Sequence, residues 1–202
     1  MTSSRSETRI CAPESVGSAQ DQPALPVMRS GHEQATSHLR MESSSAMKEM
    51  AEDVIIVGVS DLPAHDFAEM LAESEAASYR FLRRVADEWA SGANRFSGSG
   101  EDLLIAKCSG RWVGICGLSI DPYLADPRTG RVRNVYVLAD SRRKGTGRRL
   151  VQEAIQRAHG KFDLLRLRAD DTAPARLYES LGFRRCHGVP NCTHIFNCST
   201  TV

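Results

Sequence analysis

The segment VYVLADSRRKGTGRRLV, residues 135–151, carries the pattern that decides the fold of this chain. The apolar run 132–138 predicts a strand. Gly145 and Gly147 follow in a basic turn, and a helix begins there because apolar residues recur at helical spacing from Leu150 to Ala158. A strand that passes through a glycine turn into a helix is typical of a domain that mixes strands and helices.

This turn has the composition of an anion-binding site. Free main-chain N–H groups at the start of a helix, together with the helix dipole, favour a negative charge, and glycines let the backbone approach it closely. Five cations add positive charge, namely Arg142, Arg143, Lys144, Arg148 and Arg149. A pyrophosphate is therefore the expected ligand. A P-loop is excluded by its missing Lys-Ser/Thr, and the dinucleotide fingerprint is excluded because Leu150 replaces its third glycine.

Upstream of this segment, the sequence predicts a strand, helices and a hairpin. The first strand is Val54–Val59, and a helix entry with a capping side chain and a proline in the first turn follows at Ser60–Pro63. Helical spacing from Phe67 to Trp89 predicts two helices or one bent helix. Glu73 and Glu75 are candidates to line the acceptor site, although a solvated helix face is the favoured interpretation. Residues 103–120 predict a hairpin with a tight turn.

Downstream, the sequence predicts further alternation. A strand at Leu164–Ala169 is expected to run parallel to residues 132–138 through a right-handed crossover. A short helix at Ala173–Leu181 should end at Gly182 in a left-handed cap, with Phe183 packing back. One or two short strands complete the chain.

The N-terminal segment 1–50 is unlike the rest of the chain. It is dense in Ser, Gln, Glu and Pro and lacks an apolar period, so residues 1–50 are predicted to be a disordered or non-native tail. Met41, Met47 and Met50 each offer a later start. Residues 51–202 are predicted to form a single domain.

Composition narrows the class of protein. The chain has 202 residues, of which 41% are hydrophobic and 25% are charged. Its net charge of +1 produces no strong electrostatic field that would attract nucleic acid or a membrane surface. No apolar run approaches the roughly 18 residues of a membrane span, and no secretory signal is visible. The six cysteines form no C-x-x-C pair, so a reduced, cytoplasmic protein is expected.

Two motifs in combination resemble a known family. Arg142-x-x-Gly145-x-Gly147 after such a strand resembles the coenzyme A signature of the GNAT superfamily of N-acetyltransferases, and DTAPARLYESLGF, residues 171–183, is similar to the superfamily's later segment. The resemblance covers residues 53–200. It implies a single-domain GNAT-like α/β (α+β) fold, whose mixed, mostly antiparallel sheet has a central parallel splayed strand pair and flanking helices.

The resemblance also implies an activity and a site. The chain would transfer acetyl from acetyl-CoA, as co-substrate, to a primary amine of a small molecule. The alternatives are a protein or peptide amine and a non-catalytic, regulatory CoA-binding module. Tyr178 matches the tyrosine that protonates the departing thiolate, and the N–H of Val137 would face the thioester oxygen. The implied cofactor-binding residues are Val135, Tyr136, Val137, Arg142, Arg143, Lys144, Gly145, Thr146, Gly147, Arg148 and Asp171.

Several points stay open at the level of sequence. The strand RVRNV, residues 131–135, lacks the carboxylate that many relatives use as general base, so the base is a water chain, Asp121 or another group. Tyr178 is also compatible with simple packing on the sheet, and Asp171 with a helix N-cap.

Partners are only partly defined by the sequence. The acceptor is unidentified, and a homodimer is among the open oligomeric states. No nucleic acid is expected, because no aromatic residue interleaves the basic turn. No metal is expected, because the Cys and His residues near the C-terminus lack a close chelating pair. These residues are Cys186, His187, Cys192, His194 and Cys198.

Overall fold

One seven-stranded sheet organises the residues that this computed structural model describes, which are 53–169 and 172–198. The strand order is β1-β2-β3-β4-β5-β7-β6. The strands are β1 (Val54–Gly58), β2 (Asp102–Cys108), β3 (Arg111–Ile120), β4 (Thr129–Val137), β5 (Leu164–Leu167), β6 (Arg184–Arg185) and β7 (His194–Asn197). The helices are α2 (Ala64–Ala76), α3 (Phe81–Ser91), the 3₁₀ turn η1 (Ala139–Ser141), α4 (Thr146–Ala158) and α5 (Thr172–Glu179). The prediction for residues 1–50 lies outside the described residues.

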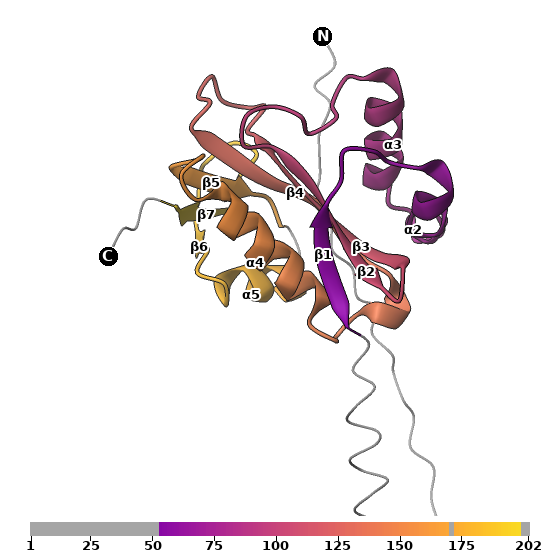
Figure 1. The fold of residues 1–202 in the computed structure, drawn as a ribbon. Coiled ribbons are helices and arrows are strands. Elements are labelled where there is room, and N and C mark those ends of the chain that lie inside the picture. Colours follow the sequence, from indigo (N-terminus) through magenta and orange to yellow (C-terminus); the bar gives the residue numbers. More distant parts are fainter. Residues whose placement is uncertain (1–52, 170–171, 199–202) are drawn as a thin grey trace, which may run out of the picture. The chain divides into compact units, whose positions relative to one another are not determined.

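Helices cover both faces of the sheet: α2 and α3 lie on one face, and α4 and α5 lie on the other (Figure 1). Two glycines of β3 let these layers close. A Cβ added to Gly114 would lie 3.0 Å from the Leu150 side chain of α4, and one added to Gly117 would lie 2.6 Å from the Phe96 ring. The apolar core therefore continues through the sheet on both sides of β3.

The elements before β4 agree with the prediction in type and differ in detail. The helical stretch forms two helices, and Gly92, at a φ of 75°, ends α3 in the left-handed region. Pro63 is the residue before α2 instead of lying in its first turn. The β2–β3 hairpin turns at Ser109 and Gly110, whose φ values are 49° and 84°. These values match a two-residue turn with two left-handed positions.

Strands β4 and β5 form the parallel pair that the sequence predicts. They are paired only where Thr129–Arg131 meets Leu164–Arg166, and they separate beyond that point. Strand β4 begins three residues before the predicted position 132, because its first residues pair with β3 and β5 at once. The mixed, mostly antiparallel sheet with a central splayed pair is thus confirmed.

A bulge distorts β4 where the splay begins. The register with β3 shifts between Gly117, opposite Arg133, and Ile115, opposite Tyr136. Asn134 lies inside the bulge with a φ of 56°. Residues other than glycine seldom adopt this backbone conformation. Bulges of this kind bend a strand and are frequent next to functional sites.

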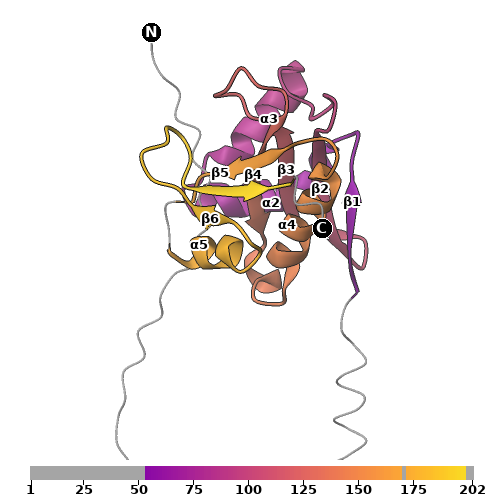
Figure 2. The same ribbon diagram turned by 90° about the vertical axis from the view of Figure 1, so that its left-hand side faces the viewer.

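The C-terminal part closes the far end of the sheet. Gly182 has a φ of 93°, and the N–H of Phe183 donates to the carbonyl of Tyr178 at 3.1 Å, so the predicted left-handed cap of α5 is confirmed. Strand β7 lies between β5 and β6, with α5 beside β6 (Figure 2). Within the described ranges, no helix combines the length and apolarity that a bilayer crossing requires.

Candidate functional site

A cleft of about 330 Å³ opens between β4, the turn that follows it, and the starts of α4 and α5. Eight of the predicted site residues line it, namely Val135, Tyr136, Val137, Arg142, Arg143, Gly145, Gly147 and Arg148. Helix α5 adds Ala173, Pro174 and Leu177. The structure therefore gathers most of the predicted set around one concave surface of a size typical for ligand sites.

The turn before α4 presents main-chain amides to this cleft. Gly145 precedes α4 with a φ of 84°, and no side chain of the described residues caps the helix start. The first amides of a helix, here Thr146 to Arg148, have no acceptor within the helix. A Cβ added to Gly145 would meet no described atom within 4 Å, so the space over the turn is open. A helix start without a described side-chain cap, a helix dipole and neighbouring arginines are together the features that an anion site requires.

The edge of β4 that faces the splay supplies a second set of main-chain groups. The N–H of Leu138 donates to the carbonyl of Val113 on β3 at 2.9 Å. Because N–H groups alternate between the two edges of a strand, those of Val137 and Val135 point toward the splay. The Nε of Arg142 donates to the carbonyl of Val137 at 2.8 Å. The signature arginine thus braces the strand edge as well as lining the cleft.

Glu73 of α2 fastens the turn to the opposite face of the sheet, a role that the sequence interpretation missed. The Tyr136 hydroxyl donates to its carboxylate at 2.6 Å and the Ala139 N–H at 3.0 Å, while a guanidinium nitrogen of Arg142 lies 3.3 Å away. The interpretation of Glu73 as part of a solvated face is wrong, although Glu75 is exposed and pairs with an arginine. Burial, followed by the Glu73 carboxylate, raises the pKa of the Tyr136 phenol.

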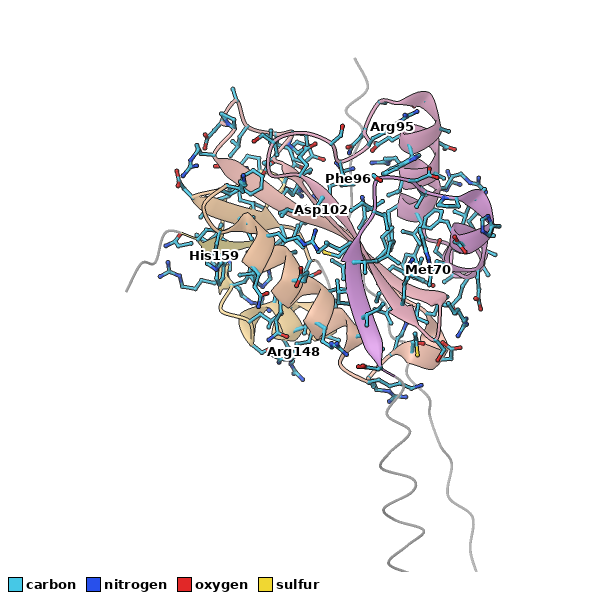
Figure 3. All side chains as sticks on the ribbon, viewed as in Figure 1. Met70, Arg95, Phe96, Asp102, Arg148 and His159 are labelled. Carbon is cyan, nitrogen blue, oxygen red and sulfur yellow. The ribbon has the colours of Figure 1, made fainter. Side chains whose placement is uncertain are left out.

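The remaining predicted cofactor residues differ in placement. Arg148, near the start of α4 (Figure 3), donates to the hydroxyl of Ser180 at 2.7 Å. Lys144 is exposed, and Thr146 is buried with its hydroxyl 3.3 Å from the carbonyl of Ser141; neither lines the cleft. Asp171 lies outside the described residues.

Tyr178 is fully buried, and it does not line the cleft as Pro174 and Leu177 of the same helix do. Its ring packs against Phe183 and His194. Its hydroxyl has no hydrogen-bond partner among the described residues, and burial raises the pKa of the phenol. Buried polar groups without a partner are rare in folded proteins. The hydroxyl is thus a protonated donor without an acceptor in the described part of the chain.

Asp121, one of the candidate general bases, lies in an environment that does not suit this role. Asp121 is completely buried, with a carboxylate oxygen 3.0 Å from Arg166 and 3.6 Å from Arg131. This carboxylate lies near the paired end of β4, is paired with two guanidinium groups and does not line the cleft, so it is poorly placed to act as a base. Over residues 53–169 and 172–198, no three His, Cys, Asp or Glu side chains are grouped to hold a metal ion.

Comparisons with known proteins point to one family. A model described as an acetyltransferase (GNAT) domain matches residues 99–185. A "putative acetyltransferase" from Exiguobacterium sp. 255-15 is 27% identical, with a TM-score of 0.63, over 72% of this chain and 93% of that chain.

Two further solved structures carry the coenzyme. A Salmonella typhimurium protein with the same description, solved with its cofactor acetyl-CoA, is 18% identical, with a TM-score of 0.54, over 73% of this chain and 95% of that chain. A GNAT family N-acetyltransferase from Escherichia coli, in complex with CoA, is 17% identical, with a TM-score of 0.51, over 74% of this chain and 83% of that chain. At these identities the two structures show the fold.

Proposed function

Because the chain belongs to the GNAT superfamily of acetyltransferases, we propose that it transfers the acetyl group of acetyl-CoA to a primary amine of a small molecule. The observation that carries this proposal is the cleft itself. It joins an uncapped, glycine-led helix start to the splayed edge of β4. These are the two surfaces that a pyrophosphate and an extended amide-bearing arm require.

The cofactor would be held mainly by the backbone. The amides from Arg143 to Arg148 would hold the pyrophosphate, and the arginines of the turn would balance its charge. The splay-facing groups of Val135 and Val137 would pair with the pantetheine arm, as a sheet edge pairs with an added strand. Glu73 and Arg142 keep this edge and the turn in one arrangement, which reduces the ordering that binding requires.

The transfer step would proceed by direct attack. The neutral amine forms a bond to the thioester carbon, and negative charge develops on the carbonyl oxygen, where a main-chain N–H of the β4 edge stabilises it by roughly 3 kcal/mol. The carbon–sulfur bond then breaks, and Tyr178 donates its proton to the departing sulfur. The amine's surplus proton passes to water. The unpartnered, protonated hydroxyl of Tyr178 supports this role, because a sulfur in the splay would supply the partner that the described residues do not.

A second cavity favours a small acceptor. It encloses about 430 Å³ between α3 and the sheet and is lined by Glu88, Arg133 and Ser119, among others. Arg133 directly precedes Asn134 of the β4 bulge, and Val135 of the cofactor cleft directly follows Asn134. The two hollows thus meet β4 on either side of Asn134, and the volume suits a small molecule.

One observation favours a different function, a CoA-binding module without catalysis. The Tyr178 hydroxyl is sealed from solvent, so a catalytic role requires α5 or the splay to open when the cofactor enters. In a purely regulatory module this tyrosine would only pack on the sheet. The two functions differ in turnover and not in affinity for CoA.

Acetyl transfer is tested by incubating the full chain with acetyl-CoA and a panel of amines, and by following release of the free thiol. The panel spans small monoamines, polyamines, amino acids and peptides with a free N-terminus. Thiol release with small amines and an acetylated product in the mass spectrum support the proposal. Tight CoA binding by calorimetry without release for any acceptor supports the non-catalytic module and overturns the proposed activity.

A further inference from the structure

The loop between β6 and β7 brings two thiols together. The N–H of Cys186 donates to the carbonyl of Thr193 at 2.9 Å, which extends the hairpin by one step beyond β6. The N–H of Cys192 approaches the carbonyl of Val189 at 3.3 Å and closes a turn. As a result, the two sulfur atoms lie only 3.3 Å apart.

The loop between these thiols is accessible and adaptable. His187, Gly188 and Val189 are exposed, Cys186 is half-buried, and Cys192 is 6% exposed. A Cβ added to Gly188 would meet no described atom within 4 Å, so this part of the loop has room to move. A disulfide bond is about 2.05 Å long, and the sulfurs therefore need to approach by only about 1.3 Å. A small oxidant can reach Cys186 from solvent.

Buried positive charge lies beside the thiol pair. Arg131 and Arg166 are 2% and 3% exposed and share the single carboxylate of Asp121. Both terminal nitrogens of Arg131 lack a hydrogen-bond partner within the described part of the chain. Burial and then the Cys192 sulfur raise the pKa of Cys186, and Arg166 acts in the opposite direction, while burial lowers the pKa of Arg131. Two cations with one anion leave an excess of positive charge next to the pair, which offsets part of the effect of burial on the Cys186 thiol.

One of these arginines, Arg166, also holds the loop. A guanidinium nitrogen of Arg166 donates to the carbonyl of Pro190 at 2.9 Å. The tip of the loop is therefore fixed to β5 while the two cysteines at its base face each other. Closing a bond between them needs no separation of this contact, because the short movement takes place at the base.

We propose that Cys186 and Cys192 form a redox-active dithiol that closes to an intramolecular disulfide on reaction with a low-molecular-weight disulfide such as oxidised glutathione. The Cys186 sulfur attacks one glutathione sulfur, releasing one glutathione thiol and forming a mixed disulfide. The Cys192 sulfur then attacks Cys186, forming the internal bond and releasing the second thiol. Two electrons and two protons pass from the protein to the two glutathione molecules.

Different features of the site are expected to determine the rate and the equilibrium of this reaction. Burial, followed by the neighbouring Cys192 sulfur, raises the pKa of Cys186 to about 11, so little thiolate is present at neutral pH and exchange is slow. The position of equilibrium depends instead on the proximity of the two sulfurs. Such a pair in a reducing compartment is typical of a redox-responsive site and not of a structural disulfide.

The test uses the reduced full-length protein, equilibrated with glutathione buffers of increasing oxidised fraction and then alkylated under denaturing conditions. We expect a mass loss of about 2 Da and protection of two thiols from alkylation. Tryptic cleavage after Arg185 yields residues 186–202, which contain Cys186, Cys192 and Cys198, and the fragment ions of this peptide show whether Cys186 is joined to Cys192 while Cys198 is alkylated. Cys186→Ser and Cys192→Ser should each abolish the bridge, whereas the matched control Cys198→Ser should retain it.

Three results would overturn the proposal. The first is no mass loss even in fully oxidised glutathione. The second is a glutathione adduct that persists on Cys186 without resolution by Cys192. The third is a bridge that includes Cys198 or Cys11 in place of the named pair. The folded state of each serine variant is checked by its thermal transition before oxidation, so that misfolding is not read as loss of the bridge.

Discussion

The cofactor cleft and the α2–α3 side of β4 use polar groups in opposite ways. In the cleft, the helix start after Gly145 is uncapped by any described side chain and open to solvent. On the α2–α3 side, charged side chains are tied to one another, as Glu73 is to Tyr136 and Arg142, and Glu88 to Arg133. The cleft offers main-chain amides to a ligand, whereas on the other side the charged groups are paired with one another, including the Glu88–Arg133 pair that lines the second cavity.

This difference shows how the two kinds of site arise from sequence. An anion site built from amides needs only a strand, two glycines and a helix start within a few consecutive residues. The contacts of Glu73 with Tyr136 and its neighbours, here called the Glu73 clasp, join residues more than 60 positions apart, and only the folded chain brings them together.

The largest effect is expected for Gly145→Glu. A carboxylate would occupy the phosphate position, so the dissociation constant for acetyl-CoA, measured by calorimetry, should rise at least about a hundredfold, or ~2.7 kcal/mol. Gly110→Glu is the matched control, because Gly110 has the same φ of 84° and equally open space in the β2–β3 turn. Equal binding by both variants would show that the turn does not hold the phosphates.

Tyr178→Phe tests whether the buried hydroxyl takes part in chemistry. We expect kcat for acetyl transfer to fall by about a hundredfold, the usual contribution of a general acid, with little change in KM for acetyl-CoA. Thermal stability should not decrease, because the hydroxyl has no partner to lose among the described residues. Tyr136→Phe serves as the comparison, since that hydroxyl bonds to Glu73 and its loss should affect stability instead. An unchanged kcat would assign Tyr178 to packing.

Glu73→Gln weakens the clasp without removing its bulk. Loss of the negative charge should leave the turn less well ordered before binding and weaken acetyl-CoA binding by about 1 kcal/mol. This would appear as an approximately fivefold rise in KM for acetyl-CoA. Glu75→Gln, on the same helix but exposed and paired with Arg83, should leave KM unchanged. If the two variants behave alike, the cofactor turn does not depend on α2.

The smallest effect concerns stability below neutral pH. His194 is 1% exposed, and burial lowers its pKa. The unfolded chain, with an ordinary histidine pKa near 6.5, therefore binds more protons than the folded one as pH falls through about 6.5, and the free energy of unfolding decreases in that window. Denaturant titrations from pH 7 to 5 should show a shallower decrease for His194→Gln. His187→Gln, in the loop between β6 and β7, should follow the wild-type slope.

Local signals made much of this molecule predictable. The β4–turn–α4 segment, the tight Ser109–Gly110 hairpin and the Gly182 cap each depend on neighbouring residues, and each appears as predicted. The sequence predicts that this strand begins at residue 132, but β4 begins at Thr129. Pairing with two neighbouring strands, and not the local sequence pattern, extends it.

The features that sequence reasoning missed depend on contacts between distant elements. Glu73 gives no local signal that it will be half-buried against β4. The burial of Asp121 between two arginines follows from the side-by-side alignment of β4 with β5. The spacing of Cys186 and Cys192 predicts neither a C-x-x-C pair nor a chelating pair, and their proximity follows from the turn that ends at Cys192.

The separation of β4 from β5 has a consequence for handling the protein. It leaves an unpaired strand edge in the middle of the sheet, and such edges invite pairing with another chain. An occupant of the splay would cover that edge, so coenzyme A in the purification buffer is expected to suppress aggregation on storage. Light scattering of concentrated samples, with and without the coenzyme, would measure this protection.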